Sequence, residues 1–116
     1  MHNYKELEIW KEGVDLAKII YQMTIEFPKD EIYGLTSQIK RCAISIPSNI
    51  AEGSGRYTTK DFNYFLAIAT GSSYELETQL ILVREFEFLS TEKISPVLKK
   101  MDILQKKIYR FKEKLV

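Results

Sequence analysis

The sequence has very few of the residues that most enzyme active sites and metal centres require. Its 116 residues include one histidine, His2, near an N-terminus expected to fray, and one cysteine, Cys42. Neither a Ser/His/Asp nor a Cys/His constellation can be assembled from them, and the usual zinc ligands are missing. A lone cysteine forms no internal disulfide, which favours the cytoplasm. We therefore expect a non-enzymatic protein with no catalytic residues, no metal and no cofactor.

Long apolar runs and phosphate-binding loops are lacking as well. No apolar stretch approaches the ~20 residues that span a bilayer, and the N-terminus has no signal-peptide layout. The run Gly53-Ser54-Gly55 is too short for a P-loop or a dinucleotide fingerprint. We predict a soluble, unprocessed protein with no membrane partner. A chain of this length with 45% apolar residues is expected to form a single domain over residues 1–116.

Charge is nearly balanced, at +1 net, but it is unevenly distributed. Residues 1–31 hold 4 basic and 7 acidic side chains, and residues 32–97 hold 6 and 7. Residues 98–116 hold 7 basic and 2 acidic side chains, so this C-terminal segment is locally +5. Clustered cations of this kind attract phosphate backbones.

Apolar residues recur three or four apart in four segments, which is typical of amphipathic helices. These segments run from about 6 to 26, from about 32 to the glycines at 53 and 55, from about 59 to 86, and from Ser90 or Ser95 to about 115. Their short connections predict an all-α fold, an antiparallel up-and-down four-helix bundle. The first helix carries a wide apolar arc, which predicts two packing partners. Two rows form this arc: Leu7, Trp10, Val14, Ala17, Tyr21 and Thr24, and beside them Ile9, Leu16, Ile20 and Met23.

Local signals predict how these helices begin and end. Pro28 should end the first helix, and Pro47 should kink the second or break it in two. Gly53-Ser54-Gly55 is expected to close the second helix with left-handed geometry. Thr58, three residues before Asp61, resembles a capping box for the third helix. For the last helix, both Ser90 and Ser95 remain possible caps.

One side of the second helix carries small and polar residues. They are Gln38, Arg41, Ser45, Ser48, Asn49, Glu52 and Arg56. Such a stripe either lets another helix approach closely while its polar groups hydrogen bond across the contact, or it touches a ligand directly. Close packing is the favoured interpretation.

Paired carboxylates are the remaining option for chemistry. Glu75 and Glu77 could face Glu52 across the bundle. A di-metal carboxylate bundle, however, needs Glu-x-x-His pairs on two helices, and the sequence contains none. The favoured interpretation is an interhelical ion pair with Arg41 or Arg56.

The basic residues of the last helix form an arc opposite its apolar seam. Asp102 and Glu113 lie at the edge of this arc, which is either a nucleic-acid-binding surface or a solvated lysine face. Tyr57 and Tyr109, each beside an arginine, either stack on unpaired bases or border an interface. The candidate nucleic-acid-binding residues are Lys40, Arg41, Arg56, Lys60, Lys99, Lys100, Lys106, Lys107 and Arg110.

Almost the whole chain resembles a known family, the four-helix bundle proteins encoded by intervening sequences of bacterial 23S ribosomal RNA genes. The most specific stretch is Arg41 to Arg56, and within it the run Ser48-Asn49-Ile50-Ala51-Glu52-Gly53. The other matching stretches are Leu7 to Lys11, Phe27 to Lys29, Tyr33 to Gln38, Phe62 to Ala69, and Gly71 to Leu80.

The resemblance implies a ring-like homo-oligomer, a pentamer, and a role in RNA binding. It extends to the accessory variability protein of diversity-generating retroelements, a basic barrel that binds nucleic acid and a reverse transcriptase. The charge layout and the resemblance lead to the hypothesis of a non-enzymatic RNA-binding homo-oligomer. The alternative is a structural module that oligomerises and binds a partner protein without nucleic acid.

Overall fold

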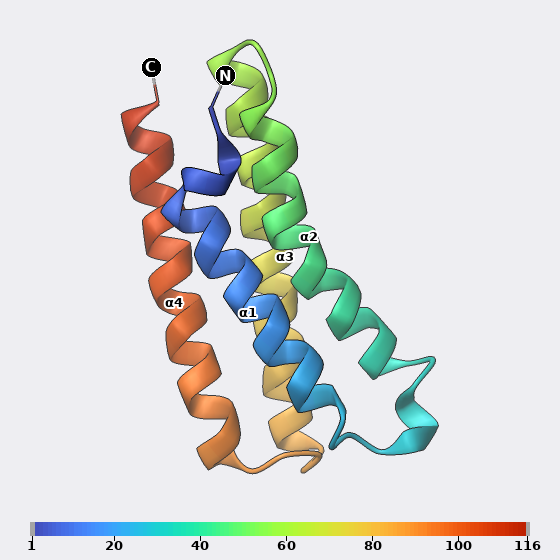
Figure 1. Cartoon of the computed structure of the whole chain (residues 1–116). Helices are drawn as coiled ribbons and strands as arrows, with labels where there is room; N and C mark the ends of the chain where they lie inside the picture. The colour runs from blue at the N-terminus through green and yellow to red at the C-terminus, as the bar shows by residue number, and fades with distance from the viewer. Residues whose placement is uncertain (1, 116) are drawn as a thin grey trace.

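The computed structural model describes residues 2–115, which fold into four helices (Figure 1). The helices are α1 (Glu8–Thr24), α2 (Leu35–Ser54), α3 (Thr59–Glu85) and α4 (Thr91–Lys114). Two short 3-10 turns, η1 (Tyr4–Glu6) and η2 (Lys29–Glu31), precede α1 and α2. No β-strand occurs in these 114 positions, so the predicted all-α fold is confirmed.

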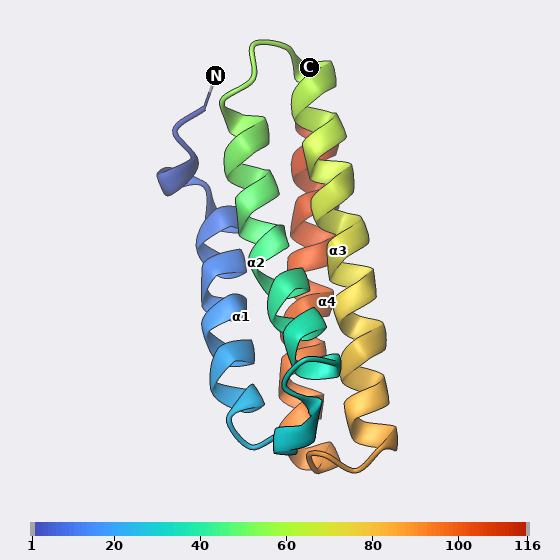
Figure 2. The ribbon, with the colours of Figure 1, turned by 90° about the vertical axis from the view of Figure 1, so that its right-hand side faces the viewer.

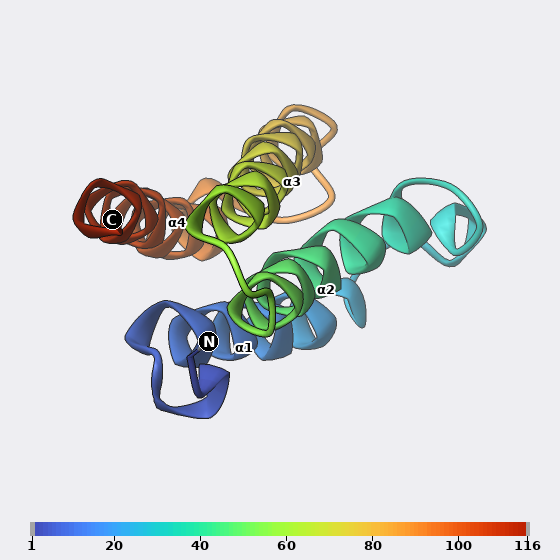
Figure 3. The same ribbon diagram turned by 90° about the horizontal axis from the view of Figure 1, so that it is seen from above.

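The helices run alternately up and down in a bundle of 44 × 24 × 20 Å (Figures 1 and 2). Each helix packs against the next one in the chain, and α4 packs against α1. Seen from above, α3 and α4 lie on one side and α1 and α2 on the other (Figure 3). The antiparallel bundle is therefore confirmed, and α1 has the two helical partners, α2 and α4, that its wide apolar arc predicted.

The core of the bundle is built from the apolar seams of the four helices. On α1 the buried apolar residues are Ile9, Leu16 and Ile20, which belong to the second of the two rows. The row that contains Trp10 and Tyr21 lies farther out and is partly or largely exposed, except for its last member, Thr24, which is buried. The largest fully buried side chains are Leu16, Ile20, Ile39, Ile46, Ile50, Leu66, Leu76, Leu80, Ile94, Met101, Leu104 and Ile108.

Helix α2 continues through Pro47 without a break, so the predicted division into two pieces is wrong. Pro47 is buried and packs against Gly13 of α1. A Cβ added at Gly13 would lie 3.3 Å from the Cβ of Pro47. The glycine thus makes room for the proline ring, so α1 and α2 approach closely at Pro47.

The end of α2 differs from the prediction, because none of the glycines among residues 2–115 has a positive φ. Gly55 closes the helix in right-handed geometry, with φ −85° and ψ −1°. Gly53 is needed for a different reason. A Cβ added there would lie 2.7 Å from Phe65 Cβ and 2.9 Å from Phe62 Cδ1. The glycine therefore allows α3 to approach α2 closely.

The predicted start of α3 is confirmed, and the start of α4 is decided. Thr58 is the N-cap of α3, and its Oγ1 accepts a hydrogen bond from the Asp61 N–H at 3.1 Å. Helix α4 begins after Ser90, the earlier of the two alternatives, and Pro96 lies inside the helix. The Ser90 side chain makes no capping hydrogen bond, but its carbonyl accepts from the N–H groups of Lys93 and Ile94.

The N-terminal segment is held against the bundle, contrary to the expectation that it frays. The His2 N–H donates to the carbonyl of Ser54 at 2.9 Å. The His2 ring makes edge contacts with Phe62 of α3 and Phe111 of α4, at centroid distances of 5.2 and 6.0 Å. His2 thus connects the end of α2 with α3 and α4.

Candidate nucleic-acid interface

The basic residues of α4 divide according to the side of the helix on which they lie. The buried seam that includes Val97, Met101, Leu104 and Ile108 faces the core. The side chains of a helix project in all directions around it. The cations outside this seam therefore differ in how far they are exposed to solvent. Exposed residues Lys99, Lys106 and Arg110 lie on the outer surface of α4, and Lys100 and Lys107 are partly buried.

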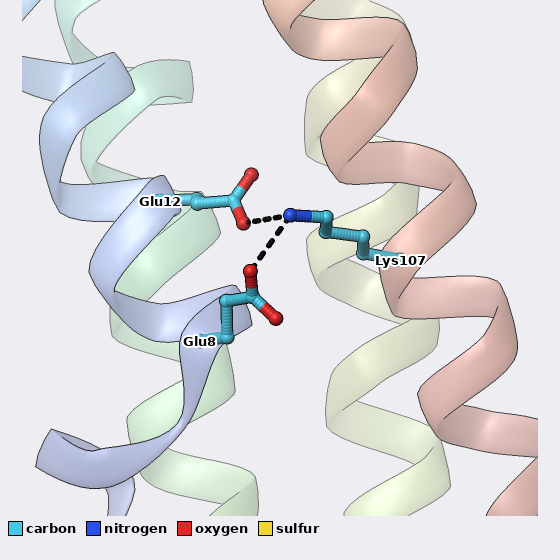
Figure 4. A network of polar contacts seen from close by, with 3 residues as sticks. All are labelled: Glu8, Glu12 and Lys107. Carbon is cyan, nitrogen blue, oxygen red and sulfur yellow. Dashed lines mark hydrogen bonds and ion pairs between the residues drawn. The ribbon is translucent and has the colours of Figure 1, made fainter.

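Lys107 points toward α1 and contacts two carboxylates (Figure 4). Its Nζ lies 2.8 Å from Glu8 Oε1 and 2.6 Å from Glu12 Oε2. The hydrogen bond and the charge of Lys107 lower the pKa of Glu8. The hydrogen bonds to Glu12 and then Glu8 raise the pKa of Lys107. Lys107 therefore bridges α4 and α1, and its charge is compensated within the protein.

We expect Lys107→Met to lower the melting temperature more than Lys106→Met does. Lys107 bridges two helices, whereas Lys106 pairs only with Asp102 one turn away on α4, and exposed pairs within one helix contribute little. Thermal unfolding followed by circular dichroism would measure the difference. Equal melting temperatures for the two variants would contradict a bridging role for Lys107.

The stability that this bridge contributes should depend on pH in a defined direction. The folded pKa of Glu8 lies below its usual value of 4.5, so its stabilising contribution is present above that value. The contribution is lost as the pH falls through the lowered folded pKa. The folded pKa of Lys107 lies above 10.5, so its contribution is present below 10.5 and is lost as the pH rises through the folded pKa. The difference between Lys107→Met and the unmodified protein should therefore shrink in acid.

The remaining candidate cations lie at several places on the bundle. Lys106 pairs with Asp102 at 2.9 Å, and Arg56 pairs with Glu52 at 2.9 Å. Two of them cover aromatic rings: Arg56 lies over Phe65, and Lys40 lies over Tyr21. Arg56 and Lys60 flank the connection between α2 and α3, far along the chain from Lys99 on α4. The candidates without an ion pair to any residue from 2 to 115 are Lys40, Arg41, Lys60, Lys99, Lys100 and Arg110.

A groove between α3 and α4 brings cations and aromatic rings together. It has a volume of about 340 Å³. Tyr74 of α3 is 56% exposed, and Tyr109 of α4 is 63% exposed. Gln105 joins the two helices, because its Nε2 donates to Ser73 Oγ at 3.2 Å and to Glu77 Oε1 at 3.0 Å. The residues that line the groove are Tyr74, Asp102, Gln105, Lys106, Tyr109 and Arg110.

Tyr74 was not predicted from the sequence, whereas Tyr109 was. Tyr74 and Arg110 line the same groove only because α3 packs against α4 in this register, and no periodicity within α3 signals this. Tyr57, the other selected tyrosine, lies in the connection between α2 and α3 and is 90% exposed. It does not line the α3–α4 groove.

Part of the polar stripe of α2, at Ser45 and Asn49, is packed as the favoured interpretation predicted. The other members of the stripe are exposed: Gln38, Arg41, Ser48, Glu52 and Arg56. Ser45 Oγ and Ser72 Oγ share a hydrogen bond of 2.8 Å across the two helices. Asn49 Nδ2 donates to the carbonyl and the hydroxyl of Ser45. The N-terminal part of the stripe borders an open cleft of about 370 Å³. The residues that line this cleft are Gln38, Arg41, Cys42, Ser45, Ser72 and Glu75.

The ion pairs that were predicted for the glutamates of α3 do not form in the described part of the chain. Arg56 pairs with Glu52, four residues earlier on the same helix. Glu77 faces α4, where it accepts the hydrogen bond from Gln105. Glu75 lies beside Cys42 of α2 and lines one cleft with Arg41, but it makes no ion pair with that arginine.

Cys42 is a buried free thiol beside this cleft. Burial and then the negative charge of Glu75 raise the pKa of Cys42 to about 11. The thiol is therefore protonated near neutral pH, and the nucleophilic thiolate is scarce.

No three or more His, Cys, Asp or Glu side chains among residues 2–115 are grouped so that they could hold a metal ion. None of the helices in that range is both long and apolar enough to cross a bilayer.

Comparison with protein families identifies the relatives of this chain. The sequence profile of the 23S rRNA-intervening sequence protein family matches residues 5–110. The chain belongs to this family. The match spans all of α1, α2 and α3 and most of α4, so the resemblance noted in the sequence is confirmed. The family description names no catalytic activity.

A solved structure of the same kind of fold supports the bundle. A protein of unknown function from the S23 ribosomal protein family of Bacteroides thetaiotaomicron matches with a TM-score of 0.84. The match covers 91% of this chain and 99% of that chain, at 20% sequence identity. At this identity the similarity establishes the fold alone. A search of curated proteins found no match.

Proposed function

We propose that this member of the family is a non-enzymatic RNA-binding homo-oligomer, a pentamer as the resemblance implies. The α3–α4 groove is its principal RNA-binding surface. The observation that carries the proposal is the position of Arg110 and Lys106 beside the exposed rings of Tyr74 and Tyr109. Cations attract the phosphates, and aromatic rings offer surfaces for bases.

The availability of the groove cations to phosphate supports the groove as the RNA-binding surface more than the net charge of the chain does. Arg110 has no ion pair with residues 2–115, so its guanidinium is available to a phosphate. Lys106 pairs with Asp102, but both side chains are more than half exposed. Exposed pairs contribute little to stability, so exchange of the carboxylate for a phosphate costs little.

The other candidate cations have secondary parts in the proposal. Lys99 and Lys100 lie on α4 and extend the positive charge along it, whereas Arg41 and Lys60 lie on α2 and α3. Lys107 has no part in RNA binding, because two carboxylates compensate its charge. In a symmetric ring each copy would repeat the groove, so the weak charge of one copy would be multiplied.

Titration of a labelled RNA stem-loop with an unpaired loop would test the proposed function. We expect binding at low salt that weakens steeply as the salt concentration rises, because phosphate contacts release counterions. Fluorescence anisotropy would measure the affinity at low and physiological salt. Absence of binding at low salt would exclude the proposed function, and binding that salt leaves unchanged would exclude a phosphate-driven interface.

The second candidate function is a module that binds a partner protein without nucleic acid. It is favoured by the apolar side chains exposed around the connection between α1 and α2. Ile25 is 82% exposed and Tyr33 is 95% exposed, and Ile32 lies between them in the chain. Exposed apolar patches of this kind mark protein interfaces. A partner complex that survives nuclease treatment, together with no RNA binding at low salt, would favour this candidate.

A further inference from the structure

We propose that the α3–α4 groove holds an unpaired nucleobase, so that the RNA bound there is single-stranded at the point of contact. This inference rests on the proposed function and specifies the form of RNA that the same surface recognises. It is carried by the free ring faces of Tyr74 and Tyr109, the fixed amide of Gln105 and the position of Arg110.

The two tyrosine rings are available for stacking. Tyr4 and Tyr64 contact neighbouring aromatic rings, and Tyr21 lies beneath Lys40. Tyr74 and Tyr109 have no ring or cation contact with residues 2–115, and both are more than half exposed. They come from two different helices and line one groove. Stacking on aromatic rings is available to any unpaired base, because every base has a π-face.

The side-chain amide of Gln105, which lines the groove, is held in a defined orientation. The Gln105 amide nitrogen must point toward Glu77, because a carboxylate only accepts hydrogen bonds. The second hydrogen bond of the same nitrogen, to Ser73, ties α4 to α3. The amide oxygen of Gln105 has no hydrogen-bond donor among residues 2–115. It is therefore available as an acceptor for an amino or imino group on the edge of a base.

The two cations of the groove, Lys106 and Arg110, are placed to contact the RNA phosphates next to a stacked base. Lys106 and Arg110 are four residues apart on α4, and so lie on one face of the helix, the face that also borders the groove. A duplex keeps its bases stacked on each other and hidden from the tyrosine rings. A duplex also carries more phosphates than one strand does, so charge alone would favour the duplex over the single strand.

The experiment compares the two forms of RNA on the full-length protein. The probes are a labelled, unstructured oligoribonucleotide and the perfect duplex of the same sequence, both measured by fluorescence anisotropy at low salt. We expect the single strand to bind at least roughly tenfold more tightly than the duplex. We expect Tyr74→Leu and Tyr109→Leu each to weaken single-strand binding at least roughly fivefold.

Matched variants separate stacking from other effects. Tyr109→Phe keeps the ring and loses only the hydroxyl, so it should retain most of the single-strand affinity that Tyr109→Leu loses. Tyr57→Leu makes the same change at an exposed tyrosine outside the groove and should also have no effect. A fluorescent purine analogue in the strand should be quenched on binding, and the Tyr109→Leu variant should relieve this quenching.

The outcomes distinguish the inference from the proposed function. If the duplex binds as well as the single strand and the leucine variants bind normally, the inference is wrong and the proposed function stands. If neither form of RNA binds at low salt, both are wrong. A preference for the single strand that depends on both tyrosine rings would support the inference.

Discussion

Gly53→Ala is expected to lower the free energy of unfolding by about 1–3 kcal/mol. Alanine is the better helix former, so propensity alone would make this change stabilising. The added Cβ, however, would lie 2.7 Å from the Cβ of Phe65 and 3.3 Å from the carbonyl oxygen of Phe62. These two atoms belong to the backbone of α3 or lie next to it, so α3 itself would have to move. The steric cost therefore outweighs the gain in helix propensity.

Gly71→Ala is the matched control, because it makes the same chemical change on an exposed part of α3. A Cβ added at Gly71 meets nothing within 4 Å. We expect this variant to be more stable than the unmodified protein by roughly 0.5–1 kcal/mol. Urea unfolding of both variants would measure the two changes. Equal changes of the same sign would contradict the close contact between α2 and α3 at Gly53.

Reversal of both groove cations, Lys106→Glu with Arg110→Glu, is expected to weaken RNA binding at least roughly tenfold at low salt. Each lost phosphate contact should also reduce the salt dependence. The slope of log affinity against log salt should fall by about 1–2 for the two residues together. Both side chains are exposed, so the fold should be retained, and circular dichroism would verify this.

The control for this prediction is Lys11→Glu with Lys18→Glu on α1. Both lysines are exposed, and the double reversal changes the net charge by the same amount. Helix α1 lies on the other side of the bundle from the α3–α4 pair (Figure 3). We expect a much smaller loss of affinity. Equal losses in the two double variants would indicate a long-range effect of net charge, and the groove would not be the binding surface.

Much of the fold could be predicted from the sequence because the signals for each helix lie within its own stretch of residues. The spacing of apolar residues in α3 and the Thr58 cap depend on neighbours within one or two helical turns. These signals gave the bounds of α3 within one residue. The apolar seam of α4, from Val97 to Ile108, was likewise visible from spacing alone.

The central stretch from Ser45 to Arg56 shows where local signals were insufficient. The two glycines were interpreted as a left-handed stop, yet Gly53 is small because α3 packs against it. Ser45 was assigned correctly to close packing, since it bonds to Ser72. Arg56 is held by Glu52 and Phe65, whereas Arg41 has no ion pair within residues 2–115.

The sequence by itself determined that this chain forms four amphipathic helices, that its cations concentrate in the last of them, and that it resembles its family. Only the tertiary structure decided which charges remain available. Lys107 and Arg110 are three residues apart on α4, yet Lys107 bridges to α1 and Arg110 borders a groove with Tyr74. Periodicity describes one helix at a time. The partners of a side chain depend on the register and rotation of the neighbouring helices, which packing of the whole core sets.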